Sequence, residues 1–241
     1  PAEAPAVDVL FYAGCATTYR RPEMARTAIT LIERSGVRAA TLADESCCGE
    51  PLHVLGFRAE ARAQAERTME SIRATGAHTV VCSCPSCVLT FRTHYPAWGV
   101  DVPKELRILH ISEYLAEAIG SGKMRFSRSQ PIRLTYHDPC SLGRELGVYD
   151  APRQVLSAIP GAQFQEMRLN RQYSPCCGNG GGVLATNSKI AHGAGKNAGQ
   201  VVLETGADVL ITACPSCKHS LVKHVRDMEV LDIAELVERA L

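Results

Sequence analysis

Short apolar runs alternate with longer amphipathic stretches along the 241 residues of this chain. Four runs have the length and composition of buried strands: residues 7–12, 79–81, 132–136 and 209–211. Three longer stretches space their apolar residues as an amphipathic helix does and end near a glycine: residues 23–34, 58–74 and 190–204. Strands that alternate with helices predict right-handed crossovers and a mostly parallel sheet, so we expect an α/β fold.

The same succession of elements occurs twice. Residues 109–113 close the first half with a short strand that runs into an acidic helix, and residues 231–235 do the same in the second half. A repeat that extends beyond single motifs indicates a duplicated fold unit. We therefore predict two pseudo-symmetric repeats, each a mostly parallel sheet flanked by helices, at residues 1–122 and 131–241. The polar segment 123–130, in a Gly- and Ser-rich stretch, is the predicted linker.

Composition and charge narrow the class of protein. The formal net charge is +1 and the basic residues are dispersed, which argues against a nucleic-acid or anionic-membrane surface. No apolar run approaches the roughly 18–20 residues that span a bilayer, and the first residues lack the basic and apolar regions of a signal peptide. An odd number of cysteines, eleven, with vicinal pairs argues against a secreted disulfide scaffold. We expect a soluble protein of a reducing compartment, the cytoplasm.

Ten of the eleven cysteines form one pattern that is written twice: a single cysteine, a Cys-Cys pair and a Cys-x-x-Cys motif. These parts are separated by 31 and 35 residues in the first copy and by 35 and 36 in the second. Five thiols that converge from separate places along a chain suit a polynuclear metal centre, because thiolates select iron–sulfur chemistry or zinc. The two sets are Cys15, Cys47, Cys48, Cys84 and Cys87 in the first copy, and Cys140, Cys176, Cys177, Cys214 and Cys217 in the second.

The residues around these cysteines suit a site at the carboxyl edge of a sheet, where α/β proteins bind ligands. Cys87 is expected in the first turn of a helix, whose free N–H groups and dipole favour a thiolate. Pro85 fits that turn, and Pro215 fits the same turn in the second copy. Gly49 and Gly178 each follow a Cys-Cys pair, where a sharp loop demands a positive φ. The run 178–182 lacks the frame of a phosphate-binding loop, so we expect its backbone to approach a cluster.

The order Cys, Cys-Cys-Gly, Cys-x-x-Cys resembles the cysteine-rich CCG domain of heterodisulfide reductase catalytic subunits, and the resemblance covers nearly the whole chain. The same domain occurs in iron–sulfur subunits of glycolate oxidase, lactate utilisation and anaerobic glycerol-3-phosphate dehydrogenase. The segments 137–144 and 176–182 are similar to that family's second module. The resemblance implies that each set of five cysteines holds a noncubane [4Fe-4S] cluster. Larger relatives also carry a ferredoxin-like region with closely spaced cysteines, a pattern that these 241 residues lack.

Simpler interpretations account for less of the cysteine pattern. Structural zinc takes four ligands, so each copy would leave one thiol unused. A thioredoxin-like dithiol would explain the Cys-x-x-Cys motifs and leave the other cysteines unexplained. Cys82, the eleventh cysteine, is interpreted as a small buried residue, with a spare ligand or a redox thiol as the alternatives. His137 either donates a hydrogen bond to sulfide or substrate, or organises the loop with Asp138.

The leading interpretation is an iron–sulfur redox subunit of a multi-subunit oxidoreductase. In a catalytic version, similar to heterodisulfide reductase, the two clusters face a pocket and reduce a disulfide. In a relay version, similar to glycolate or lactate dehydrogenase systems, a flavin subunit oxidises the substrate and this chain passes the electrons on; a zinc-stabilised scaffold is the third alternative. No flavin- or nicotinamide-binding fingerprint is visible, so we expect ferredoxin-like or flavoprotein partner subunits. The pattern assigns no catalytic residue and names no substrate.

Overall fold

The computed structural model describes residues 7–241, which form two four-stranded sheets, one in each half of the chain. Every strand pair within these sheets is parallel, which confirms the predicted fold class. The order is β2-β1-β3-β4 in the first sheet and β6-β5-β7-β8 in the second, so the two repeats share one topology. The strands are β1 (Val9–Tyr12), β2 (Ala39–Ala40), β3 (Thr79–Cys82), β4 (Arg107–His110), β5 (Arg133–His137), β6 (Gln163–Glu166), β7 (Val209–Thr212) and β8 (Glu229–Asp232).

Helices connect the strands as right-handed crossovers require, and several short helices carry the cysteines. In the first repeat they are α1 (Cys15–Arg20), α2 (Pro22–Arg34), α3 (Glu50–Val54), α4 (Arg58–Ala74), α5 (Pro85–Leu89), α6 (Tyr95–Ala97) and α7 (Ile111–Gly120), with a π-helical turn η1 (Thr90–His94). In the second they are α8 (Asp150–Ala158), α9 (Val183–Thr186), α10 (Ser188–Leu203), α11 (Pro215–Leu221) and α12 (Ile233–Ala240), with η2 (Ser141–Glu145, π-helical) and η3 (Arg171–Tyr173, 3-10).

The three helices predicted from apolar spacing are present, with shifts of one or two residues at the ends of two of them. α4 has the predicted bounds. α2 begins one residue early, at Pro22, because a missing N–H costs nothing in the first turn of a helix. α10 begins at Ser188 because the Asn187 side chain caps it, accepting a hydrogen bond of 3.1 Å from the amide of Ile190.

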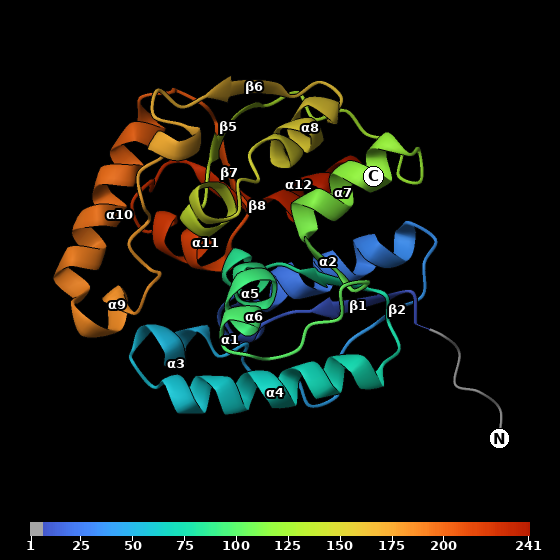
Figure 1. The fold of residues 1–241 in the computed structure, drawn as a ribbon. Coiled ribbons are helices and arrows are strands. Elements are labelled where there is room, and N and C mark those ends of the chain that lie inside the picture. The colour runs from blue at the N-terminus through green and yellow to red at the C-terminus, as the bar shows by residue number, and fades with distance from the viewer. Residues whose placement is uncertain (1–6) are drawn as a thin grey trace.

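The two repeats share one apolar core. Figure 1 shows α2, α7, α8 and α12 in the layer between the two sheets. α7, the last helix of the first repeat, packs on α8 of the second, and α12 packs on α2. A fully buried leucine stabilises the fold by about 1.5–3 kcal/mol, so this layer ties the repeats together strongly. Its fully buried side chains come from all four helices and include Leu31, Ile32, Leu115, Leu156, Leu236 and Val237.

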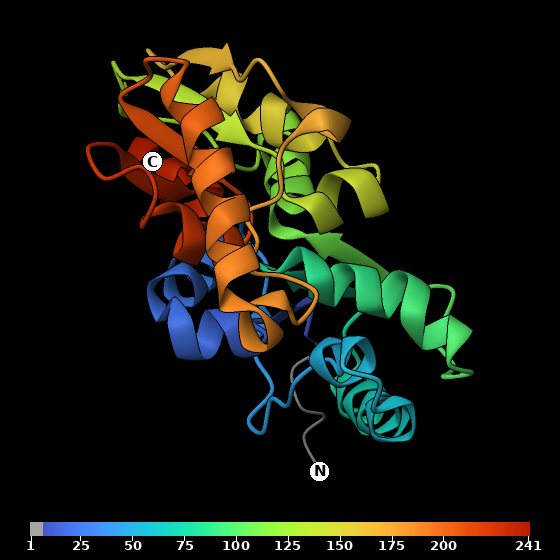
Figure 2. The same ribbon diagram turned by 90° about the vertical axis from the view of Figure 1, so that its left-hand side faces the viewer.

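Each sheet has a second, outer face with an apolar cluster of its own. α4 covers this face in the first repeat and α10 in the second (Figures 1 and 2). The buried thiols belong to these outer clusters, so the cysteine sites lie beneath α4 and α10 at one edge of each sheet. Within residues 7–241 no helix is both long and apolar enough to cross a membrane.

Candidate metal centres

The single cysteine of the first repeat lies in the turn that follows β1. Cys15 begins α1 directly after Gly14, whose φ is +75°. A β-carbon at Gly14 would lie 2.9 Å from the Cys87 Sγ, so only glycine allows the backbone to pass this close to that thiol. The Glu45 carboxylate accepts hydrogen bonds of 2.9 and 2.7 Å from the amides of Ala13 and Gly14. These two bonds fasten the turn to the loop that carries the Cys-Cys pair.

The pair Cys47-Cys48 closes that loop against the single cysteine. Gly49 follows it with a φ of +92° and precedes α3, so the predicted left-handed glycine is present. The Cys47 Sγ lies 3.5 Å from the Cys15 Sγ. Hydrogen bonds from the Cys15 and Cys48 thiols lower the pKa of Cys47 to about 3, and the same contact raises the pKa of Cys15. The single cysteine and the pair therefore form one sulfur group.

Both Cys-x-x-Cys motifs open helices, as predicted. Cys84 is the N-cap of α5, with Pro85 as the first helical residue and Cys87 in the first turn. Cys214 and Pro215 take the same positions at α11. Hydrogen bonds from the Cys214 and Cys87 thiols hold the pKa of Cys84 well below its usual value. The two motifs therefore meet across the boundary between the repeats.

The second repeat brings its five cysteines together in the same way. The Cys140 thiol, directly before η2, donates a hydrogen bond that lowers the pKa of Cys176 to about 2. The amide of Gly178, whose φ is +81°, donates to the Cys176 Sγ at 3.4 Å. The Cys177 Sγ lies 3.2 Å from the Cys217 Sγ. The single cysteine, the vicinal pair and the helix N-terminus again converge.

A buried ion pair fastens the loops of the second site, where the first site uses Glu45. Arg153 is 8 % exposed and donates two hydrogen bonds to Asp138, at 2.8 and 2.9 Å. Asp138 also accepts a bond of 2.8 Å from the amide of Arg171. The carboxylate thereby links the end of β5 to the segment that leads to Cys176. A bidentate arginine–carboxylate pair fixes the geometry of such a link.

The structure describes the two residues whose roles the sequence left open. His137 is fully buried, and its Nε2–H donates to the Pro175 carbonyl at 2.8 Å, so it organises the loop before the Cys-Cys pair. Burial lowers the pKa of its imidazole, and its Nδ1 has no partner among the described residues. Cys82 is fully buried on β3, where it pairs with Tyr12 of β1. Thr212 holds the equivalent position on β7 of the second repeat. Burial raises the pKa of Cys82 well above its usual value. These facts favour the interpretation of Cys82 as a small buried residue.

The thiols lie close together within each repeat, and Cys84 and Cys214 link the two sets across the boundary. Cys15 approaches Cys47, and Cys140 is hydrogen-bonded to Cys176, so each single cysteine lies against the Cys-Cys pair of its own repeat. All eleven cysteines are free thiols. Among residues 7–241, no group of three or more Cys, His, Asp or Glu side chains is arranged to hold a single metal ion.

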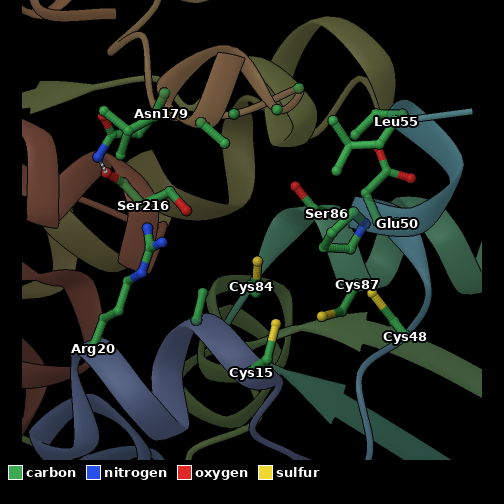
Figure 3. A pocket seen from close by; sticks show the side chains of 18 of the residues that line it. Cys15, Arg20, Cys48, Glu50, Leu55, Cys84, Ser86, Cys87, Asn179 and Ser216 are labelled. Atoms are coloured by element: carbon green, nitrogen blue, oxygen red, sulfur yellow. Dashed lines mark hydrogen bonds between the residues drawn. The ribbon is translucent and has the colours of Figure 1, made fainter. Parts of the chain in front are cut away.

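A cavity of about 480 Å³ opens beside the first group of thiols. Its walls come from α1, α3 and α5 of the first repeat and from the glycine-rich loop, α9 and α11 of the second (Figure 3). Ser86 and Ser216, which occupy equivalent positions in the two Cys-x-x-Cys motifs, both line it. Its volume is that of a small-molecule site. The lining thiols are Cys15, Cys48, Cys84 and Cys87.

Nothing in the sequence indicates that the second repeat helps to build this cavity. Residues 179–182 follow the Cys-Cys pair of the second repeat, yet they line the cavity beside the thiols of the first. Arg20 also lines it, and no motif distinguishes this arginine from the others in the chain. The sequence could have identified Arg20 only by its position, five residues after Cys15 on the helix that Cys15 begins.

The donor set fits an iron–sulfur centre. Each group has five unoxidised thiols at loop ends and helix N-termini, where amides donate to sulfur. Open space lies beside four thiols of the first group. Thiolate ligands, amide donors and room for inorganic sulfide are what such a cluster requires.

Fold and site together define a duplicated α/β protein with a cysteine-rich site at the same edge of each sheet. The chain belongs to the CCG family: the family model described as "Cysteine-rich domain" matches residues 9–92 and 134–222. Each match contains all five cysteines of its repeat and ends before the last strand of its sheet, β4 or β8.

Characterised relatives are components of oxidoreductase complexes. One component of the dihydromethanophenazine:CoB–CoM heterodisulfide reductase of Methanosarcina barkeri is 36% identical over 243 residues, 97% of this chain and 59% of the relative. One component of the CoM/CoB fumarate reductase of Methanothermobacter marburgensis is 35% identical, over 95% of this chain and 46% of the relative. An uncharacterised iron–sulfur protein of Methanococcus maripaludis is 30% identical, over 97% of this chain and 47% of the relative. The chain thus spans about half to three fifths of the length of these relatives.

A solved structure shares the fold without a close sequence relationship. A hypothetical protein from Helicobacter pylori superposes with a TM-score of 0.68 at 10% identity, over 98% of this chain and 49% of that one. At this identity the likeness concerns the fold alone.

Proposed function

We propose that this chain is an iron–sulfur redox subunit of a heterodisulfide-reductase-like complex and that it reduces a disulfide-type substrate. The repeats at 1–122 and 131–241 would each hold one cluster, of the noncubane [4Fe-4S] type. Bound clusters would supply one-electron chemistry. The proposed ligands are Cys15, Cys47, Cys48, Cys84 and Cys87 in the first repeat, and Cys140, Cys176, Cys177, Cys214 and Cys217 in the second.

The observation that carries the catalytic version is the cavity between the repeats. An electron relay needs only centres near a docking surface, whereas a cavity of about 480 Å³ with a wall of thiols gives a small molecule access to the site. Reduction of a disulfide breaks one S–S bond, takes up two electrons and two protons and yields two thiols. Two centres in adjoining repeats suit a reaction that takes its electrons one at a time.

The electrons would come from a partner subunit of ferredoxin or flavoprotein type. The chain has no flavin- or nicotinamide-binding fingerprint, so it needs a second redox protein docked close to one of its sites. The cysteine-bearing edge of the sheets offers exposed loops for such contact. The chain alone should therefore be nearly inactive with a nicotinamide donor.

Iron and sulfide quantification on anaerobically prepared protein, with EPR on the same sample, tests the metal assignment. Two clusters per chain predict about eight iron and a similar amount of sulfide, from four of each in a [4Fe-4S] centre. Tightly bound zinc without sulfide would support a structural scaffold instead. Reduction of small disulfides by the dye-reduced protein then tests the catalytic version, and filled clusters without that activity would favour the relay.

A further inference from the structure

One positive charge in the sulfur-lined cavity has no partner among the residues that the structure describes. Arg20 is the one Lys, Arg or His side chain among the described residues that line this cavity. It stands in the last turn of α1, and Figure 3 shows its guanidinium extending into the cavity on the side of Ser216. Within residues 7–241 it makes no hydrogen bond or ion pair, although an arginine presents five N–H donors.

The acids near the cavity are already engaged with other groups. Glu50, the carboxylate that lines the cavity, lies 2.9 Å from the His94 Nδ1 and 3.3 Å from the Thr90 hydroxyl. Glu23, three residues beyond Arg20, contacts Lys218 at 3.4 Å and the neighbouring arginine at 3.7 Å. Neither acid neutralises Arg20, so its charge is available to a ligand.

The other residues that line the cavity include apolar side chains and hydroxyl groups. The wall beside α3 is apolar and includes Val54 and Leu55, while Ser86 and Ser216 supply hydroxyl groups. The second repeat has Glu145 at the position of Arg20, counted from its single cysteine, and Glu145 does not line the cavity. The cation is therefore specific to this cavity and does not follow from the duplicated pattern.

We propose that Arg20 is the specificity-determining residue of this cavity and binds a carboxylate, sulfonate or phosphate group of the small molecule that reaches the thiols. The inference rests on the proposed function only in taking that molecule to be a disulfide or thiol. A planar guanidinium pairs with such oxyanions through two parallel hydrogen bonds, which a lysine cannot reproduce. The ligand thus has an apolar body with an anionic end and its sulfur directed at the cysteine wall.

Binding of three aliphatic disulfides of similar size tests this assignment by calorimetry on the oxidised, metal-loaded protein without a reductant. The probes are 3,3′-dithiodipropionate (anionic), 2-hydroxyethyl disulfide (neutral) and cystamine (cationic). The wild-type protein should bind the anionic probe best. Because Arg20 lies at a solvent-accessible rim, Arg20→Gln should weaken binding of that probe by about 5- to 20-fold and change the neutral probe less than about twofold. Arg20→Lys should fall between Gln and wild type.

Arg26→Gln is the matched control, because Arg26 is exposed on α2, unpaired among the described residues and absent from the cavity. It should leave all three affinities unchanged. Equal losses for all three probes in Arg20→Gln, no loss for the anionic probe, or no binding of that probe to the wild type would each overturn the assignment. Because no electrons are transferred here, failure of the disulfide-reduction assay would leave this result standing, and the two hypotheses fail separately.

Discussion

Tyr12 and His137 stand at the same position in the two repeats and make the same hydrogen bond. Each lies at the carboxyl end of the first strand of its sheet. The Tyr12 hydroxyl donates to the carbonyl of Ser46, and the His137 Nε2–H donates to the carbonyl of Pro175. In both repeats the acceptor is the residue directly before the Cys-Cys pair. Two unlike side chains thus hold equivalent cysteine loops at a fixed distance from the strand.

Tyr12→Phe should loosen the first site and leave the second unaffected. The change keeps the ring and removes one hydrogen bond, for a loss of about 0.5–1.5 kcal/mol in the free energy of unfolding. Iron should pass to a chelator faster from the first site, so release from the variant should become biphasic. Tyr173→Phe is the control, since Tyr173 is 71 % exposed. Unchanged release in Tyr12→Phe would mean that the bond does not position the loop.

The single cysteine and the Cys-Cys pair of each repeat lie together, which predicts independent loss of metal when one of these thiols is replaced. Cys47→Ser or Cys176→Ser should lower the iron content to about half, because each variant lacks one ligand of one centre. Cys82→Thr is the matched control: it places on β3 the residue type that β7 carries at Thr212, and it should keep all the iron. Iron analysis with EPR measures both.

Cys84→Ser should behave differently from those variants. The Cys84 thiol contacts Cys214 of the other repeat, so this change should disturb the spectrum of both centres. Full loss of iron from every variant, accompanied by loss of helical circular dichroism, would instead indicate that the chain unfolds when either site is damaged.

Gly178→Ala should destabilise the protein strongly, whereas Gly180→Ala should not. Gly178 has a φ of +81°, and a β-carbon there would lie 2.2 Å from the carbonyl oxygen of Ala191 on α10. Left-handed strain and this backbone clash together should cost at least about 2 kcal/mol. At Gly180 no atom lies within 4 Å of the added carbon. Denaturant unfolding of the two variants measures the difference; equal midpoints would show that the loop can move away from α10.

Local sequence was sufficient to predict the inner strands, the three long helices and the turns that carry the cysteines. The spacing of apolar residues defined α4 to the residue, and Pro85 and Pro215 marked the first turns of α5 and α11. Glycine after each Cys-Cys pair predicted the left-handed turns at Gly49 and Gly178. These features depend on backbone conformation and neighbouring residues, so they can be read from short segments.

The edge strands β2 and β6 were not predicted, and other features that sequence did not reveal depend on contacts between the repeats. Apolar periodicity shows that α2 and α12 have a buried face, but it does not show that they bury it against each other. The same limit applies to the cavity, where Ser86 and Ser216 come together from positions 130 residues apart. Duplication predicts two similar halves and leaves their docking undetermined.

Asp232 should make the protein less stable as the pH rises. This fully buried carboxyl caps α12 by accepting a bond of 3.0 Å from the amide of Ala234, and its second oxygen has no partner among the described residues. Burial, with the nearby Glu235 carboxylate, raises its pKa to about 7 against the opposing effect of Lys218. An unfolded aspartate titrates near 3.9.

The sign follows from comparing proton uptake by the two states. Between about pH 4 and 7 the unfolded chain has released this proton while the folded chain retains it, so the free energy of unfolding falls with rising pH and levels off above pH 7. Asp232→Asn resembles the protonated side chain and keeps a capping oxygen. Its advantage over wild type should therefore grow by about 2.5 kcal/mol between pH 5 and pH 8, measured by denaturant unfolding. Asp208→Asn is the control of opposite sign, because the Arg133 guanidinium lowers the pKa of Asp208, and this variant should be slightly less stable than wild type at pH 8. A constant difference between Asp232→Asn and wild type across this range would show that Asp232 is ionised in the folded protein, with Lys218 as its counter-charge.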